Sequence, residues 1–370
     1  MPDISSFVDS YSLRRLLLII IAVLLVIVVL LFVVLISHKV LIEYRERRLR
    51  RQKELYIDTL SKRLFDPLQE IRRPKTFIEF CAIADVIIDM LLSVSGSMES
   101  QIQGFVRDLG VAQFYKNMVM SRSWLKRLTA TERLGYFRLP EMKDFFHYLL
   151  EVEKDNEVIV RTIFALSMIA KDEADFKIIN RFLKNPYFMS SKFNEYIYTH
   201  IIRSILRNGQ SDLFLEFLKS LRDDASIPVF LKRDIIEACG SEKFHPAKDI
   251  IIDYFRHFSD TPEMKITCIR ALGKMGGEDV CRIILSCLDD QDWRVRAVAA
   301  KHAYLCSLDI IGTLRRCLQD ESYYVRINAA TSLSRFGEQG ISALREEMQS
   351  PDRFTRDVSR YIVNEVLIYA

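Results

Sequence analysis

The six histidines and seven cysteines are the residues of this 370-residue sequence that could ligate a metal ion or act as reactive nucleophiles. The histidines are His38, His147, His200, His245, His257 and His302, and the cysteines are Cys81, Cys239, Cys268, Cys281, Cys287, Cys306 and Cys317. Metal sites of this kind use short spacings such as Cys-x-x-Cys, which the sequence lacks, and it also lacks the GxxxxGKS or GxxxxGKT motif of phosphate-binding loops. The sequence therefore predicts no catalytic residue, no metal and no cofactor.

Basic residues recur at a fixed spacing toward the C-terminus and could line a groove. The segment LDDQDWRVRAVAAKHAYL at 288–305 returns as LQDESYYVRINAATSLSRF at 318–336, which places Arg296 and Arg326 one repeat apart, and Arg356 follows at the same interval. Toward the N-terminus this register position is assigned to Arg133, Arg161, Lys192, Lys232 and Lys265. The stacked side chains could bind an acidic peptide. Alternatively they bond aspartates and helix-end carbonyls between repeats, which the neighbouring Asp290, Asp292 and Asp320 favour.

Paired helices are the elements that would position these residues. Each repeat has an apolar segment on either side of a polar turn, and the pairs Ala299-Ala300 and Ala329-Ala330 stand where a helix must lie close to its neighbour. A period of about 30 residues is typical of stacked solenoids. The stretch resembles the HEAT-repeat family, most closely its short bacterial form. This resemblance implies an all-α fold with a binding solenoid over residues 121–370, preceded by an atypical helical cap over residues 67–120.

The cysteines fit the interior of such repeats. Their number is odd, most stand at apolar helix positions, and Cys287 and Cys317 occupy equivalent places in successive repeats. We therefore expect small core residues in a reducing compartment.

Some proteins with HEAT-like repeats are enzymes, and their ligand patterns can be compared with this sequence. Resemblance to deoxyhypusine hydroxylase would require His-Glu dipeptides that hold two irons, but none of the six histidines is followed by Glu. An enzyme or enzyme subunit of lyase-like type remains an alternative that rests on the fold alone. A non-catalytic role is the favoured interpretation.

Residues 16–36 form an uninterrupted apolar segment, LLLIIIAVLLVIVVLLFVVLI. A helix of this length matches the roughly 30 Å hydrocarbon core of a bilayer. The following SHKVLIEY contains no small-residue cleavage site, which argues against a secretory signal peptide. Two basic residues precede the segment and seven follow it within residues 39–53, so residues 1–15 are expected outside and the body in the cytoplasm. Because the short repeat is commonest in bacteria, we expect a bacterial inner membrane.

Residues 37–66 are predicted to continue as a basic juxtamembrane helix. Its basic cluster comprises Arg45, Arg47, Arg48, Arg50, Arg51 and Lys53. These side chains either contact anionic lipid or act only as the topology signal. An apolar stripe that includes Tyr56 and Leu60 could pair with a second copy, giving a homodimer or a signalling stalk. Residues 39–53 hold seven basic and two acidic residues against a net charge of +4 for the whole chain, so we expect no nucleic-acid partner.

Aromatic residues gather where the interval between register residues widens to 40, between Lys192 and Lys232. They are Tyr187, Phe188, Phe193, Tyr196 and Tyr198. Core packing is one interpretation, and a bulge that contacts a partner is the other.

The sequence as a whole predicts a membrane-anchored scaffold. Its solenoid would hold a protein partner at the cytoplasmic membrane face, and a membrane-bound polysaccharide-synthesis enzyme is an example of such a partner. The lyase-like enzyme and the signalling stalk are the alternatives.

Overall fold

The computed structural model describes residues 4–66, 68–94, 96–184 and 191–369, with no side chains described at 4–18, 22, 191 and 366–369. Every regular element in these ranges is a helix, and they contain no strand. The predicted all-α fold is therefore confirmed. The chain forms two compact units, residues 1–117 and 118–370.

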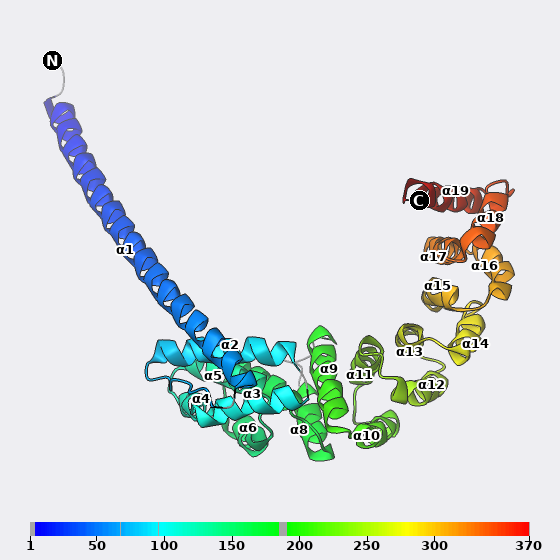
Figure 1. Cartoon of the computed structure of the whole chain (residues 1–370). Helices are drawn as coiled ribbons and strands as arrows, with labels where there is room; N and C mark the ends of the chain where they lie inside the picture. The colour runs from blue at the N-terminus through cyan, green and yellow to red at the C-terminus, as the bar shows by residue number, and fades with distance from the viewer. Residues whose placement is uncertain (1–3, 67, 95, 185–190, 370) are drawn as a thin grey trace. The chain divides into compact units, whose positions relative to one another are not determined.

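The first unit begins with α1 (Ile4–Phe65), a single helix that runs through the apolar segment and the basic segment without a break (Figure 1). It is followed by α2 (Phe77–Ser93), α3 (Ser97–Asp108) and α4 (Val111–Val119), which ends just beyond the unit boundary. Within the described residues, α1 is the one helix whose length and composition would allow it to cross a membrane, and its most apolar stretch is not buried against the protein.

The C-terminal turns of α1 pack against α2. Tyr56 is 4% exposed and Leu60 is fully buried, and Lys53 Nζ lies 2.6 Å from the Asp85 carboxylate of α2. The expectation that Tyr56 and Leu60 belong to a free stripe for a second copy is therefore wrong, because both side chains lie in the core of their own unit. The juxtamembrane helix and the helices after it form one packed body rather than a stalk and a separate cap.

The rest of this unit is held by aromatic stacking and by a capped helix start. The Phe80 and Phe114 rings stack with centroids 4.0 Å apart, and the Tyr115 hydroxyl donates to the Phe80 carbonyl over 3.3 Å. Thr76 and Glu79 form a capping box at the start of α2. The backbone N–H groups of Lys75 and Thr76 donate to the Glu79 carboxylate and hold its pKa below the ordinary value, although burial opposes this.

The second unit consists of alternating first and second helices of successive repeats. The first helices are α5 (Trp124–Tyr136), α7 (Asn156–Ser167), α9 (Ser191–Asn208), α11 (Val229–Ser241), α13 (Pro262–Met275), α15 (Trp293–His302), α17 (Tyr323–Ser334) and α19 (Arg353–Tyr369). The second helices are α6 (Lys143–Val152), α8 (Glu173–Leu183), α10 (Ser211–Asp223), α12 (Lys248–His257), α14 (Glu278–Cys287), α16 (Ile311–Cys317) and α18 (Gly337–Glu347). From α11 onward the first helices line the inner side of an arc and the second helices its outer side (Figure 1).

The core of this unit lies between the two layers of helices. Apolar side chains of both layers are fully buried there, for example Val295, Leu314, Val325, Leu333 and Leu344. No helix could bury this surface alone, so each repeat depends on its neighbours for stability.

Small residues let neighbouring first helices approach each other closely. Ala299, Ala300, Ala329 and Ala330 are fully buried, as the repeat pattern predicts. A Cβ atom added to Gly240 of α11 would lie 2.5 Å from the Ala271 Cα of α13. The backbones therefore leave no room for a larger residue at this contact.

The cysteines behave in two ways. Cys239, Cys268, Cys287 and Cys317 are free and buried, as expected for core residues. Cys281 of α14 and Cys306, which follows α15, form a disulfide with their Cα atoms 5.4 Å apart. The expectation that all seven cysteines are simple packing residues is wrong for this pair, because the turn after α15 brings Cys306 back onto α14.

The close approach of α11 and α13 gives a test of the repeat packing. Gly240→Ala should lower the free energy of unfolding by about 2 kcal/mol, because the added methyl group overlaps Ala271. Gly312→Ala is the matched control: nothing lies within 4 Å of the added Cβ, so it should raise stability by about 0.5 kcal/mol through helix propensity. Thermal unfolding followed by circular dichroism measures both changes. Equal effects of the two substitutions would contradict the close packing.

Candidate protein-binding surface

The basic residues at the register position are used inside the solenoid. Arg296 forms a bidentate ion pair with Asp320 of the next repeat, with N–O distances of 2.7 and 3.0 Å, and also donates to the carbonyls of Asp290 and Gln291. Although burial opposes it, the Arg296 guanidinium holds the pKa of Asp320 below its ordinary value. Lys265 pairs with Asp290 at 2.7 Å. The structural interpretation of this column is therefore confirmed here.

The bonds to backbone carbonyls recur at the next two repeats. Arg326 donates to the carbonyls of Asp320 and Glu321, and Arg356 donates to those of Ser350 and Pro351. The acceptors are the carbonyls of the turn that precedes each first helix. Each cation therefore ties its own helix to the turn before it.

The register assignment fails in the first two repeats. Arg127, rather than Arg133, donates to the carbonyls of Ser121 and Arg122 and pairs with Glu153 at 2.8 Å. Arg161 instead pairs with Glu132 of the preceding first helix at 3.3 Å. Basic residues are frequent on these helices, so the spacing alone did not distinguish the one that faces the turn.

Three of the five residues of the predicted aromatic bulge lie in the described part of the chain, and one of these three is exposed. Tyr187 and Phe188 lie outside the described residues. Phe193 is half-buried, and Tyr196 is 46% exposed with its ring stacked on Phe164. Tyr198 is 1% exposed and its hydroxyl donates to Asn180, so the prediction that Tyr198 contacts a partner is wrong. Its ring faces the core because it lies on the opposite side of α9 from Tyr196.

The residues of the basic cluster of α1 differ in exposure. Arg45, Arg47, Arg48, Arg50 and Arg51 are exposed, as contact with lipid headgroups would need. Lys53 is half-buried and forms an ion pair with Asp85. It is therefore a packing residue of this unit rather than a surface contact.

Exposed aromatic side chains gather instead on the first helices of the last three repeats. They are Trp293, Tyr323, Tyr324, Phe354 and Tyr361, with exposed fractions of 43% to 59%. Trp293 of α15 and Tyr324 of α17 stack with ring centroids 5.4 Å apart. We call this set the aromatic patch. It was not singled out from the sequence, although an aromatic residue one or two positions before each Val-Arg or Thr-Arg pair was a visible signal.

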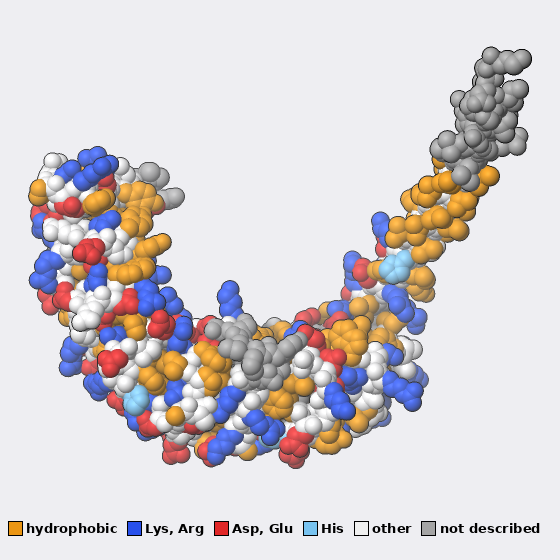
Figure 2. All heavy atoms as spheres, turned by 180° about the vertical axis from the view of Figure 1, so that it is seen from behind, with side chains coloured by type: hydrophobic (Ala, Val, Ile, Leu, Met, Phe, Trp, Pro, Cys, Tyr) orange, Lys and Arg blue, Asp and Glu red, His pale blue; other side chains and the backbone are white. Residues whose placement is uncertain are grey.

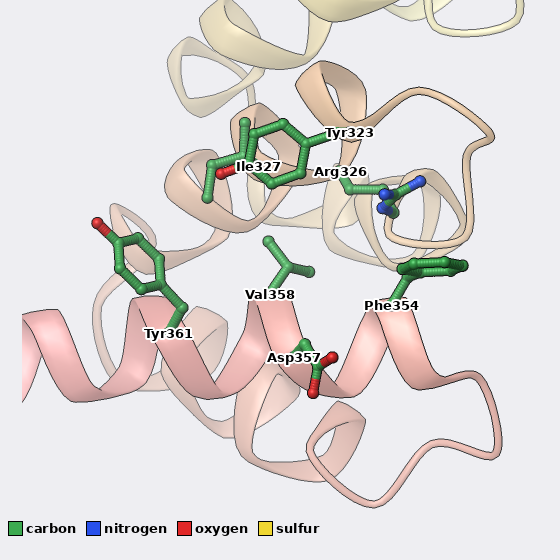
Figure 3. A pocket seen from close by; sticks show the side chains of 7 residues that line it. All are labelled: Tyr323, Arg326, Ile327, Phe354, Asp357, Val358 and Tyr361. Atoms are coloured by element: carbon green, nitrogen blue, oxygen red, sulfur yellow. The ribbon is translucent and has the colours of Figure 1, made fainter.

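A cavity of about 160 Å³ opens in this patch between α17 and α19 (Figure 3). Its apolar walls are Tyr323, Ile327, Phe354, Val358 and Tyr361. Two charged side chains, Arg326 and Asp357, complete the lining. Ligand pockets usually measure roughly 300–1,000 Å³, so this cavity suits one inserted side chain rather than a whole small molecule.

Arg326 gives the cavity a fixed wall. Its guanidinium carbon lies 4.7 Å from the Phe354 ring centroid and 6.0 Å from that of Tyr323. Because the backbone carbonyls hold Arg326 in place, the two rings are positioned on either side of a rigid cation. Bonds within the protein thus hold this wall of the cavity.

Two other hollows are larger than this cavity, but charged side chains line both of them. One of about 480 Å³ between α12 and α14 is lined by charged residues that pair among themselves, with Asp253–Arg256 at 3.4 Å and Asp279–Arg282 at 2.6 Å. One of about 340 Å³ in the first unit lies beside Arg63 and Arg73. In the described part of the chain, no three or more His, Cys, Asp or Glu side chains gather as metal ligands would.

Comparison with known families finds two matches. The family described as HEAT repeats matches residues 214–303, and the family described as HEAT repeat matches residues 310–340. No curated protein matches the chain. Among solved structures, human deoxyhypusine hydroxylase in complex with glycerol is 15% identical, with 76% of this chain and 94% of that chain covered and a TM-score of 0.25. An engineered protein is 12% identical, with coverage of 85% and 98% and a TM-score of 0.29. These two likenesses do not bear on activity.

Arg296 provides a test of the register bonds. Arg296→Ala should lower the free energy of unfolding by about 2 kcal/mol, because Asp320 loses its bidentate partner and two turn carbonyls lose their donor. Arg294→Ala is the control, since Arg294 is exposed and its pairs with Asp292 and Glu263 lie in solvent. Denaturant unfolding should resolve a change for Arg296 only. A similar loss in both variants would mean that the register bonds are no different from surface ion pairs.

Proposed function

We propose that this chain, a member of the HEAT-repeat family, is a membrane-anchored scaffold whose repeats hold a protein partner at the cytoplasmic membrane face. The coarser part of this statement, a helical repeat scaffold, follows from the family itself. The anchor, the side of the membrane and the partner belong to the proposal.

The aromatic patch is the observation that supports a protein partner. Aromatic residues and arginine are enriched at the centres of protein interfaces, where a few of them supply most of the binding energy. Five exposed rings on three neighbouring helices, beside a cavity the size of one side chain, have this composition. Folded surfaces rarely leave such a set in water without a binding role.

The length and apolar surface of α1 support the anchor, and its five exposed arginines favour contact with the anionic headgroups of the cytoplasmic leaflet. The excess of basic residues after the apolar segment supports a cytoplasmic body, and the bacterial inner membrane remains the proposed location. The Cys281–Cys306 disulfide is of a kind more typical of an oxidising compartment, and the protease experiment in oriented vesicles distinguishes the two orientations.

A scaffold tethered in this way would meet partners in the same membrane at a high local concentration. A polysaccharide-synthesising membrane enzyme is one partner of this kind.

The anchor and its orientation are tested in membrane vesicles. The full chain should resist extraction by alkaline carbonate, and deletion of residues 16–36 should release it into the soluble fraction. Added protease should digest the body in inside-out vesicles and spare it in right-side-out vesicles. Digestion in right-side-out vesicles alone would reverse the orientation, and carbonate release of the full chain would refute the anchor.

The aromatic patch is tested by affinity capture of the full chain in mild detergent, with co-purifying proteins identified by mass spectrometry. Phe354→Ser and Tyr361→Ser should each weaken the captured complex at least tenfold, as expected for interface side chains worth about 2 kcal/mol. Tyr148→Ser is the matched control, because Tyr148 is 52% exposed on α6, away from the patch. Capture that is unchanged by the two patch variants would exclude this surface.

A further inference from the structure

Four basic side chains share the inner face of three neighbouring first helices. They are Arg270 and Lys274 of α13, Lys301 of α15 and Arg335, which caps the end of α17. We call them the inner basic cluster. Arg270 and Lys301 each lie five residues after a register cation, and Lys274 and Arg335 each lie nine residues after one. Positions five and nine are one helical turn apart, so they occupy the same side of each helix.

A half-buried histidine, His302, lies at the contact between α13 and α15, next to these side chains. Gly273 of α13 has no side chain, and the His302 ring of α15 packs into that space: a Cβ on Gly273 would lie 2.5 Å from His302 Nδ1. Burial, and after it the positive charges of all four cluster residues, lower the pKa of His302 to about 4. Cations from three helices therefore act on one uncharged imidazole.

The cluster is poorly neutralised by the protein. Glu237 of α11 is the carboxylate that the structure pairs with it, at 3.8 Å from Arg270 and 3.5 Å from Lys274. Arg335 lies over the Tyr304 ring, with its guanidinium carbon 4.2 Å from the centroid. All four side chains are exposed.

Three arginines of the outer helices differ from the inner basic cluster, because each is paired with an acid. Arg282 pairs with Asp279 in α14, and Arg345 pairs with Glu338 in α18. Arg315 of α16 reaches both Glu346 and Glu347. These outer arginines are neutralised, whereas the inner basic cluster is only partly so, and complementarity calls for an anionic group at the cluster.

We propose that the inner basic cluster binds an acidic segment of the protein partner, an extended stretch with several Asp or Glu residues. This deepens the proposed scaffold function and rests on it. The carboxylates would replace water around the exposed ammonium and guanidinium groups, and an apolar side chain of the same segment would enter the cavity between α17 and α19. Figure 2 shows hydrophobic side chains along the inner edge of the C-terminal repeats, with Lys and Arg side chains beside them.

A peptide fits this surface better than other polyanions. The first helices line the concave side of the arc, where a flat bilayer has no access and an extended chain does (Figure 1). Nucleic acid requires a long track of cations that releases many counterions, and this cluster has four.

The test uses the full chain in a nonionic detergent and a short fluorescein-labelled peptide of alternating Glu and Gly with one central Phe. Fluorescence anisotropy should show saturable binding that weakens as salt is added. The double variant Lys301→Gln/Arg335→Gln should weaken binding at least tenfold. The control Arg282→Gln/Arg345→Gln removes the same charge from the outer helices and should change binding by less than twofold.

Four outcomes would overturn the inference. The first is an equal loss of peptide affinity in the two double variants, and the second is equal binding of a peptide with Gln in place of Glu. The third is binding of single-stranded oligothymidylate that is stronger than binding of the peptide. The fourth is displacement of the peptide by glycerol phosphate, which has the headgroup chemistry of an anionic lipid. Circular dichroism confirms that each variant is folded.

Affinity capture separates this inference from the scaffold function. If the Lys301→Gln/Arg335→Gln variant captures the same partner as the native chain does, the acidic-segment inference fails and the scaffold stands. If the native chain captures no partner at all, the scaffold function itself fails.

Discussion

The bonds of the register cation are the constraint on which the solenoid depends. Arg296 links the carbonyls before its own helix to the carboxylate of Asp320 in the next repeat, and Lys265 pairs in the same way with Asp290. A repeat of two helices cannot bury its apolar surface alone, so the angle between neighbours must be fixed by directional bonds as well as by packing. A bidentate guanidinium provides such a bond because its donors lie in one plane.

This constraint also bears on the proposed binding surface. In the last four repeats the register cations are held by bonds within the protein, so they form no continuous charged groove, and Arg326 is the one that also lines the cavity. The inner face instead presents the positions five and nine residues further on, which form the inner basic cluster, and the aromatic residues at the helix starts. Register cations and residues of the proposed binding surface therefore occupy different positions along α13 and α15.

In the first unit, the C-terminal part of the long helix α1 is packed into the folded body. Tyr56, Leu60 and Lys53 of α1 are engaged by α2, so the helix that emerges from the apolar segment is part of a folded body. A tether of this kind would hold that body at a defined distance from the bilayer, because a continuous helix is stiff where a Gly-rich linker is not.

The sequence alone determined the helical class, the apolar segment and the repeat over the last three units, because these features depend on the periodicity of near neighbours along the chain. It did not reveal that Arg127 rather than Arg133 faces the turn, that Tyr198 is buried while Tyr196 is exposed, or that Cys281 meets Cys306. Only the tertiary structure decided these points and assembled the aromatic patch and the inner basic cluster. Their members come from different repeats, far apart along the chain, and their meeting depends on how closely and at what angle the helices stack, which the small residues and register bonds set together.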